Sequence, residues 1–207
     1  MSAALRACLG GPFPAPCPLA AEVTNIDHPA GEPFTRERLS YETEPGERVP
    51  AFLLVPLSAT PTHPAPAITL CHQHAGQYDI GKSEPAGLSG DPMHHTGVAL
   101  ARHGFVVLCP DSLCFEERQH PRKVEDHYAG TAVAHAVSPE TDLKDEGGLK
   151  AGGLKGGNLE RFEFLRYVVD GKSLAWKSVL DFKRSVVNLV DPLPCVALAR
   201  FQLNPAC

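Results

Sequence analysis

The sequence predicts an α/β fold, in which an N-terminal antiparallel hairpin is followed by a parallel strand–helix–strand unit. Two short apolar runs indicate the parallel unit, AITLCH at residues 67–72 and FVVLCP at residues 105–110. Both are too short for a typical helix and too apolar for a surface strand, so they predict buried strands. Residues 94–104 (HHTGVALARHG) lie between them and predict a helix that ends at Gly104. A strand, a helix and a strand in this order predict a right-handed crossover and two parallel strands.

The predicted hairpin comes earlier in the chain. Residues 35–43 (TRERLSYET) alternate between polar and apolar side chains, the apolar ones being Leu39 and Tyr41. Residues 48–57 (RVPAFLLVPL) predict the second strand. The segment between them, EPGE at residues 44–47, has proline second and glycine third, which is typical of a type II turn. The two strands are therefore expected to pair antiparallel.

Two helices are predicted in the C-terminal part of the chain. The first follows from helical spacing of five apolar residues, Leu159, Phe162, Leu165, Val168 and Val169. Residues 173–190 repeat this spacing, with Ser173 as N-cap and a stop at Asp191-Pro192. The segments 72–92 and 111–158 predict loops, and the second ends in the Gly/Lys repeat GGLKAGGLKGG, typical of a flexible loop.

Composition excludes several classes of protein. The 207 residues suffice for one domain with a hydrophobic core, and the net charge of −5 forms no basic stripe, so no nucleic-acid partner is expected. No apolar run approaches the ~20 residues of a membrane-spanning helix, and the N-terminus lacks a secretory signal pattern, so no membrane partner is expected. The seven cysteines form no CxxC pair. These features predict a soluble cytoplasmic protein with reduced thiols and no metal.

One segment matches a nucleotide-binding motif. Residues 76–83 (GQYDIGKS) fit the phosphate-binding pattern G-x-x-x-x-G-K-[ST]. Such a loop needs a helix that begins within the glycine-lysine turn, because the helix N-terminus holds the phosphates. The residues after Ser83, EPAGLSGDP, contain two prolines and two glycines and oppose a helix of normal length. Lys82 and Ser83 are therefore interpreted as loop residues, with nucleotide binding as the least favoured alternative.

The same loop opens with HQHAG at residues 72–76, directly after a predicted buried strand. Four blocks of sequence together resemble the N-terminal half of the dienelactone hydrolase and acetyl-xylan-esterase-like branch of the α/β-hydrolase superfamily: RERLSYETEPGERVPAFLLVP, CHQHAGQYDIGKSEPAGLSGDP, ALARHGFVVLCPDSLCFEER and NLERFEFLRYVVDGKSLAWKSVLDFKRSV. With this resemblance the chain divides into an irregular N-terminal lead-in (residues 1–33), a partial α/β-hydrolase domain (34–192) and a tail outside the family pattern (193–207).

The resemblance implies an α/β-hydrolase-type doubly wound sheet, hydrolysis of a small carboxylic ester or lactone, and no cofactor. It implies that the backbone N–H of His74 or, as second choice, of Gln73 donates to the developing oxyanion. Gln73 replaces the glycine usual at this point of the loop. The segment DSLCFEER, with Asp111, Glu116 and Arg118, would lie beside the same pocket. A structural role in ion pairs and a turn is favoured at least as much for this segment.

The nucleophile and general base of that family are missing from the sequence. No G-x-S-x-G elbow occurs, and the last histidine is His135, although the family order is Ser, then Asp or Glu, then His. Residues 171–175 (GKSLA) match a relaxed elbow, but no histidine follows, and a helix cap explains Ser173 better. A cysteine nucleophile is discounted because Cys71, Cys109 and Cys114 lie on or beside predicted strands.

A metal site is also discounted, because the spacing of its candidate ligands matches no closed zinc pattern; these are Cys71, His72, His74, His94 and His95.

We therefore expect a C-terminally truncated hydrolase relative with little or no hydrolase activity of its own. The alternative is a non-catalytic binding or complementing module, for which another chain supplies the elbow and histidine. In this fold the strand expected after Pro192 would cover the edge of the strand at residues 67–72. That edge is therefore predicted to be open and to favour self-association, unless CVALARF at residues 195–201 covers it.

Overall fold

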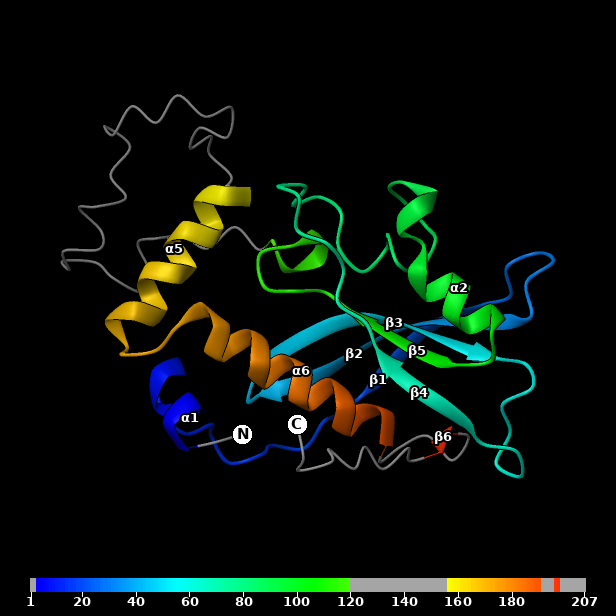
Figure 1. The fold of residues 1–207 in the computed structure, drawn as a ribbon, viewed down its shortest axis with the longest axis horizontal. Helices are drawn as coiled ribbons and strands as arrows, with labels where there is room; N and C mark the ends of the chain where they lie inside the picture. Colours follow the sequence, from blue (N-terminus) through cyan, green and yellow to red (C-terminus); the bar gives the residue numbers. More distant parts are fainter. Residues whose placement is uncertain (1–2, 120–155, 191–195, 198–207) are drawn as a thin grey trace.

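The structure, a computed structural model, describes residues 3–119, 156–190 and 196–197 of the chain (Figure 1). It confirms a mixed α/β fold, built on a six-stranded sheet with the strand order β1-β2-β3-β5-β4-β6. The strands are β1 (Glu22–Asp27), β2 (Phe34–Glu44), β3 (Glu47–Pro56), β4 (Ala65–Thr69), β5 (Val106–Pro110) and β6 (Val196–Ala197). Among the described residues, no helix has the length and apolar character needed to cross a membrane.

The predicted hairpin is confirmed. β2 and β3 pair antiparallel from Phe34↔Pro56 to Glu44↔Glu47. Gly46 has a φ of 77°, which is the conformation that the third position of a type II turn requires. β3 continues the antiparallel part of the sheet by pairing with β5.

The predicted parallel pair is also confirmed, because β4 and β5 pair in parallel from Ala67↔Val106 to Thr69↔Leu108. The connection contains the 3₁₀-helix η1 (Pro92–His94) and the helix α2 (Thr96–Arg102). Gly104, at a φ of 87°, donates its N–H to the carbonyl of Ala101 and ends the helix as predicted.

The N-terminal segment differs from the prediction. Residues 1–33 were expected to be irregular, but they contain the helix α1 (Ala3–Leu9) and the strand β1. β1 pairs antiparallel with β2 along Glu22↔Ser40 to Asp27↔Arg36. Five of its six residues are exposed. Because neither face of the strand is buried, its sequence lacks the alternation of apolar and polar side chains that would predict a strand. Backbone pairing with β2 forms this edge strand without a buried face of its own.

β4 also differs in part from the prediction. It was expected to be buried, whereas of its five residues only Ala65 is buried and Ala67, Ile68 and Thr69 are half-buried. β6 pairs in parallel with Ala65 and Pro66, so within the described residues this edge is covered at its start only.

The two faces of the sheet carry separate cores, because successive side chains of a strand point to opposite faces. One core contains Val106 and Leu108, and the other contains Val107 and Cys109. The helix α6 (Leu174–Val190) packs against β2, β4 and β5 on the first face, as Figure 1 shows. α2 covers the second face, where a Cβ on Gly97 would lie 3.1 Å from Cys109 Sγ.

α6 begins as predicted. The hydroxyl of Ser173 accepts a hydrogen bond from the backbone N–H of Trp176 at 3.0 Å, which is the contact of an N-cap. The same hydroxyl donates to the carbonyl of Leu9 at 2.9 Å. Ser173 therefore caps a helix, and residues 171–175 do not form a nucleophile elbow. The preceding helix, α5 (Gly156–Val169), confirms the helical spacing read from residues 159–169.

Candidate functional site

Two loops meet where the parallel strands β4 and β5 end. The first loop (residues 70–91) follows β4, and the second (residues 111–119), which includes η2 (Glu116–Arg118), follows β5. The ring of Phe115 in the second loop packs against three rings of the first, with centroid distances of 4.8, 5.0 and 4.9 Å to His72, His74 and Tyr78. Phe115 is 3% exposed. In open α/β sheets, ligands bind at the carboxyl ends of parallel strands, so this is the place for a site.

The predicted oxyanion donors lie in the first loop. Within the part of the chain that the structure describes, no acceptor is bound to the backbone N–H of Gln73 or of His74. The next two residues, Ala75 and Gly76, have φ values of 41° and 70°, so the chain turns sharply after His74. The side chain of Gln73 is held by Glu84 at 3.3 Å. Among the described residues, an incoming oxyanion would thus displace no acceptor from either N–H group.

His72 has a structural role. Its Nδ1 donates to the carbonyl of Gln73 at 2.8 Å, and its Nε2 accepts the backbone N–H of Ser112 at 3.0 Å. These two bonds define the neutral tautomer and join the two loops. Burial lowers the pKa of His72 and favours the same uncharged form. Both ring nitrogens of His72 are therefore used to hold the two loops together.

His74 is placed differently. Its Nε2 lies 3.2 Å from both carboxylate oxygens of Glu160, on α5. The hydroxyl of Tyr78 donates to the same carboxylate at 2.5 Å. The sequence suggested a backbone donor role for His74, besides a discounted metal role, and gave no indication of Glu160. No local sequence pattern could link His74 to Glu160, because the two residues are 86 positions apart.

Lys82 lies in the loop after β4, as the sequence predicted, but its side chain is buried. Its side chain is 0% exposed, and its Nζ lies 2.9 Å from Asp111 and 2.6 Å from both Glu116 and Glu117. The neighbouring glycine is required here, because a Cβ on Gly81 would lie 2.4 Å from Asp111 Oδ1. The motif glycine and lysine therefore serve an internal ion cluster, and the ammonium group is not available to a phosphate.

Two carboxylates of this cluster also bind the backbone of the first loop. Asp111 accepts the N–H of Lys82 at 2.8 Å, and Glu116 accepts the N–H groups of Gly81 and Ser83 at 3.0 Å each. Burial raises the pKa of Asp111 to about 7, although the ammonium of Lys82 acts in the opposite direction. The pKa of Glu116 is lowered, because hydrogen bonds from Lys82 and Ser83 outweigh its burial.

The DSLCFEER segment was interpreted either as part of the surroundings of the pocket or as a structural ion-pair segment, and Arg118 shows the ion pairs. Its buried guanidinium binds Asp181 of α6 at 2.9 Å and Glu47 of the hairpin at 2.8 Å. The segment thus forms structural ion pairs and also lies beside the loop with the predicted oxyanion donors.

The cysteine and metal candidates do not form sites. Burial raises the pKa of Cys71 and of Cys109, which keeps both as thiols, and Cys114 is buried. His94 contacts Glu84 at 3.2 Å and His95 contacts the carbonyl of Ser89 at 3.0 Å.

The one group of possible metal ligands among the described residues is an acidic one, Asp111, Glu116 and Glu117. Lys82 already supplies the positive charge inside it. This cluster is therefore a salt-bridge cluster, and the histidines and cysteines that the sequence analysis discounted as ligands form no such group among the described residues.

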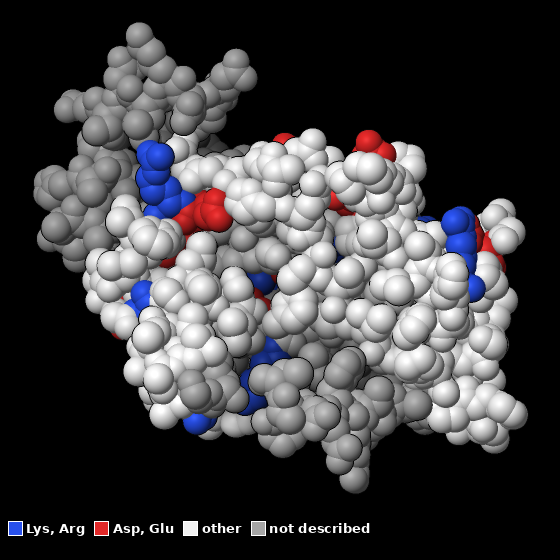
Figure 2. All heavy atoms as spheres, in the orientation of Figure 1, with Lys and Arg blue, Asp and Glu red and all other residues white. Residues whose placement is uncertain are grey.

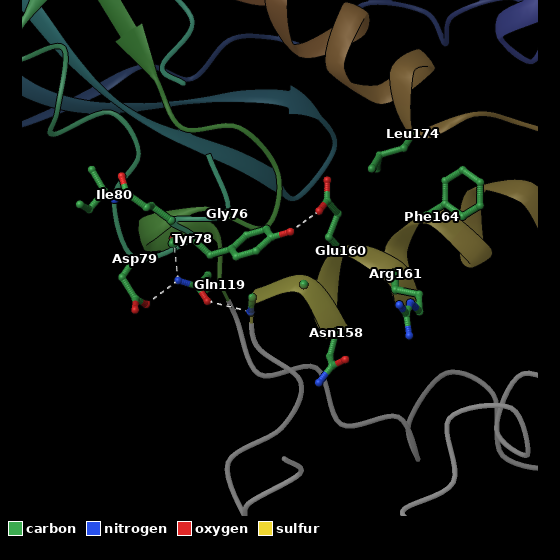
Figure 3. Close-up of a pocket in the computed structure, with 13 residues that line it drawn as sticks. Gly76, Tyr78, Asp79, Ile80, Gln119, Asn158, Glu160, Arg161, Phe164 and Leu174 are labelled. Atoms are coloured by element: carbon green, nitrogen blue, oxygen red, sulfur yellow. Dashed lines mark hydrogen bonds between the residues drawn. The ribbon is translucent and has the colours of Figure 1, made fainter. Parts of the chain in front are cut away.

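A cavity of about 900 Å³ opens between the first loop and α5, and Tyr78 and Glu160 are among the residues that line it (Figure 3). Tyr78 and Glu160 point toward each other along it, and Gln119 bridges the backbone of Tyr78 and the side chain of Asp79. Apolar groups complete the lining, namely Ile80, Phe164 and Leu174. On the face shown in Figure 2, basic and acidic side chains are interspersed, without a large area of one sign.

Comparisons with known proteins show a similarity of fold to a solved structure. No protein-family model matches the chain, and no curated protein matches it. The solved structure of a candidate acetyl xylan esterase from Bacteroides fragilis superposes with a TM-score of 0.60 at 15% sequence identity. The match covers 89% of this chain and 40% of that protein, so this chain spans less than half of its length. At this identity the likeness shows a shared fold.

Proposed function

We propose that this chain carries the oxyanion-binding part of an α/β-hydrolase-type esterase site, in the dienelactone hydrolase and acetyl-xylan-esterase-like branch. The observation that carries the proposal is the pair of N–H groups at Gln73 and His74, on the loop that leaves β4, which have no acceptor in residues 3–119, 156–190 and 196–197. β4 lies between β5 and β6 and is parallel to both. In esterases of this superfamily, the loop after the corresponding strand donates one N–H to the oxyanion. The fold likeness supports the same assignment.

The chemistry of this part is electrostatic. Backbone N–H groups directed at an ester carbonyl stabilise the negative charge that develops on its oxygen during attack. A serine nucleophile is not supplied by residues 1–207, because they contain no G-x-S-x-G elbow. We propose that these residues are inactive as a serine hydrolase and that an elbow and its histidine must come from elsewhere, as in a complementing module.

A titration with the ethyl methylphosphonate anion, a tetrahedral mimic of the oxyanion intermediate, tests the proposal. We expect saturable shifts of the backbone amide signals of Gln73 and His74 in NMR spectra, because such mimics bind transition-state donors preferentially. The amides of Gly46 and Gly104, in turns far along the chain, are matched controls. An absence of saturable shifts at Gln73 and His74 would refute the oxyanion role. Labelling of any serine by a fluorophosphonate would refute the lack of a nucleophile.

We also propose that the chain self-associates through the edge of β4. Unpaired strand edges favour pairing with a second copy. Half-buried Ile68 lies on that edge, beyond the two residues that β6 covers. Ile68→Lys should therefore shift a concentration-dependent dimer toward monomer in sedimentation velocity experiments. Leu57→Lys is the control, because Leu57 is 59% exposed outside β4. A wild-type chain that stays monomeric at all concentrations would contradict the proposal.

A further inference from the structure

We propose that His74 and Glu160 form a general-base pair that gives this chain a weak, serine-independent activity toward activated carboxylic esters. The inference rests on the oxyanion role proposed for Gln73 and His74. The sequence lacks the C-terminal histidine that serves as general base in the family. The pair would supply a general base from two other parts of the fold. One partner lies in the loop after β4 and the other on α5.

The hydrogen-bond partners define the tautomer of His74. Both carboxylate oxygens of Glu160 face Nε2, so Nε2 carries the proton and donates it. The lone pair is then on Nδ1, which accepts the backbone N–H of Gly76 at 3.2 Å. This distance is at the long end of the normal range, so the lone pair is only weakly engaged. A carboxylate behind one ring nitrogen and a lone pair on the other is the arrangement of a general base.

Tyr78 holds Glu160 in place. Burial and the adjacent carboxylate raise the pKa of Tyr78 to about 12, so the phenol keeps its proton and donates it to Glu160. The ring of Tyr78 also meets that of His74 edge-on, at a centroid distance of 5.3 Å. The phenol therefore orients both members of the pair.

The position of the pair makes it accessible to a substrate. The side chain of His74 is 55% exposed. Tyr78 and Glu160 line the cavity, which at about 900 Å³ can hold a small ester. His72, two residues earlier, is bound more closely on both ring nitrogens, at 2.8 and 3.0 Å, than His74, whose contacts are 3.2 Å long.

The reaction needs only water and the ester. His74 Nδ1 takes a proton from a water molecule while the water oxygen forms a bond to the carbonyl carbon. The carbonyl oxygen becomes an oxyanion, which the N–H groups of Gln73 and His74 stabilise. When the C=O bond re-forms, the bond to the leaving alcohol oxygen breaks and that oxygen takes up a proton. The products are one carboxylic acid and one alcohol, and the imidazole returns to its neutral form.

Hydrolysis of 4-nitrophenyl acetate by the full chain tests the pair. His74→Ala should lower the rate about tenfold, less than the 10²–10⁴-fold effect of enclosed general bases because the site is open to solvent. Glu160→Gln should lower it as well. His103→Ala, which removes another exposed histidine, should leave the rate unchanged.

Three outcomes would overturn the inference. They are an unchanged rate in His74→Ala, an unchanged rate in Glu160→Gln, or an acetyl group on the protein during turnover in intact mass spectra. The last would mean that an imidazole attacks the ester directly. The phosphonate titration separates this failure from that of the proposed function. If the Gln73 amide still responds while His74→Ala keeps the wild-type rate, the oxyanion role stands and the general-base pair does not.

Discussion

Replacing Lys82 by methionine is expected to lower the free energy of unfolding by about 3–5 kcal/mol, the cost of breaking a buried ion pair from one side. The ammonium lies within 3 Å of three carboxylates and is 0% exposed. Methionine fills a similar volume but removes the charge that Asp111, Glu116 and Glu117 share, although Glu117 keeps its ion pair with Arg38 at 2.6 Å. Urea-induced unfolding followed by circular dichroism measures the effect.

Two matched variants identify the cause of that loss. Lys183→Met removes the same charge from an exposed position on α6 and should change the free energy of unfolding by less than about 0.5 kcal/mol. Lys82→Arg keeps the charge and should retain more stability than Lys82→Met, because it preserves part of the ion pairing. Equal stabilities of wild type and Lys82→Met would show that the cluster contributes nothing net.

Phe115→Ala is expected to lower the free energy of unfolding by about 3–5 kcal/mol, as for other buried aromatic truncations. Phe115 is 3% exposed and contacts the rings of His72, His74 and Tyr78. Its loss would leave a void between the two loops. We expect the His74-dependent hydrolysis of 4-nitrophenyl acetate to fall too, because the ring that supports the imidazole is removed.

The control for this variant is Phe164→Ala, which deletes the same atoms from a side chain that is 49% exposed. Its effect on stability should be much smaller. Phe115→Leu should recover most of the stability, since it refills the void. A Phe115→Ala protein with wild-type stability would mean that the loops are held by hydrogen bonds and ion pairs alone.

Local patterns predicted most of the secondary structure. The hairpin turn, the end of α2 at Gly104 and the cap of α6 at Ser173 depend on residues only a few positions apart. β1 was missed because its side chains are exposed and its formation depends on β2. The burial of β4 was overestimated, because an apolar run does not reveal whether a neighbour covers its edge.

Of the candidate site, the sequence predicted only the loop after β4 that carries Gln73 and His74, and the oxyanion role of their N–H groups stays a prediction. The position of Gln73 and His74 follows from a strand that ends in a loop, which the sequence shows. The partners of Lys82 lie about 30 residues further on, and the partner of His74 lies 86 residues further on. Nothing in the local sequence encodes such pairings. Residues that match a nucleotide-binding motif therefore form an ion cluster instead. Position 81 requires glycine because a Cβ there would clash with the Asp111 carboxylate.

The strand order also governs the sequence in which the protein assembles. β5 lies between β3 and β4, although β4 comes before it in the chain. The β2–β3 hairpin can form early, since its contacts are local, whereas β4 gains a neighbour only after residues 106–110 have docked on β3. During synthesis the loop with Gln73 and His74 thus leaves the ribosome before its support exists. Until then the nascent segment around Ile68 lacks its parallel partner, and unpaired apolar strands of this kind favour misassembly.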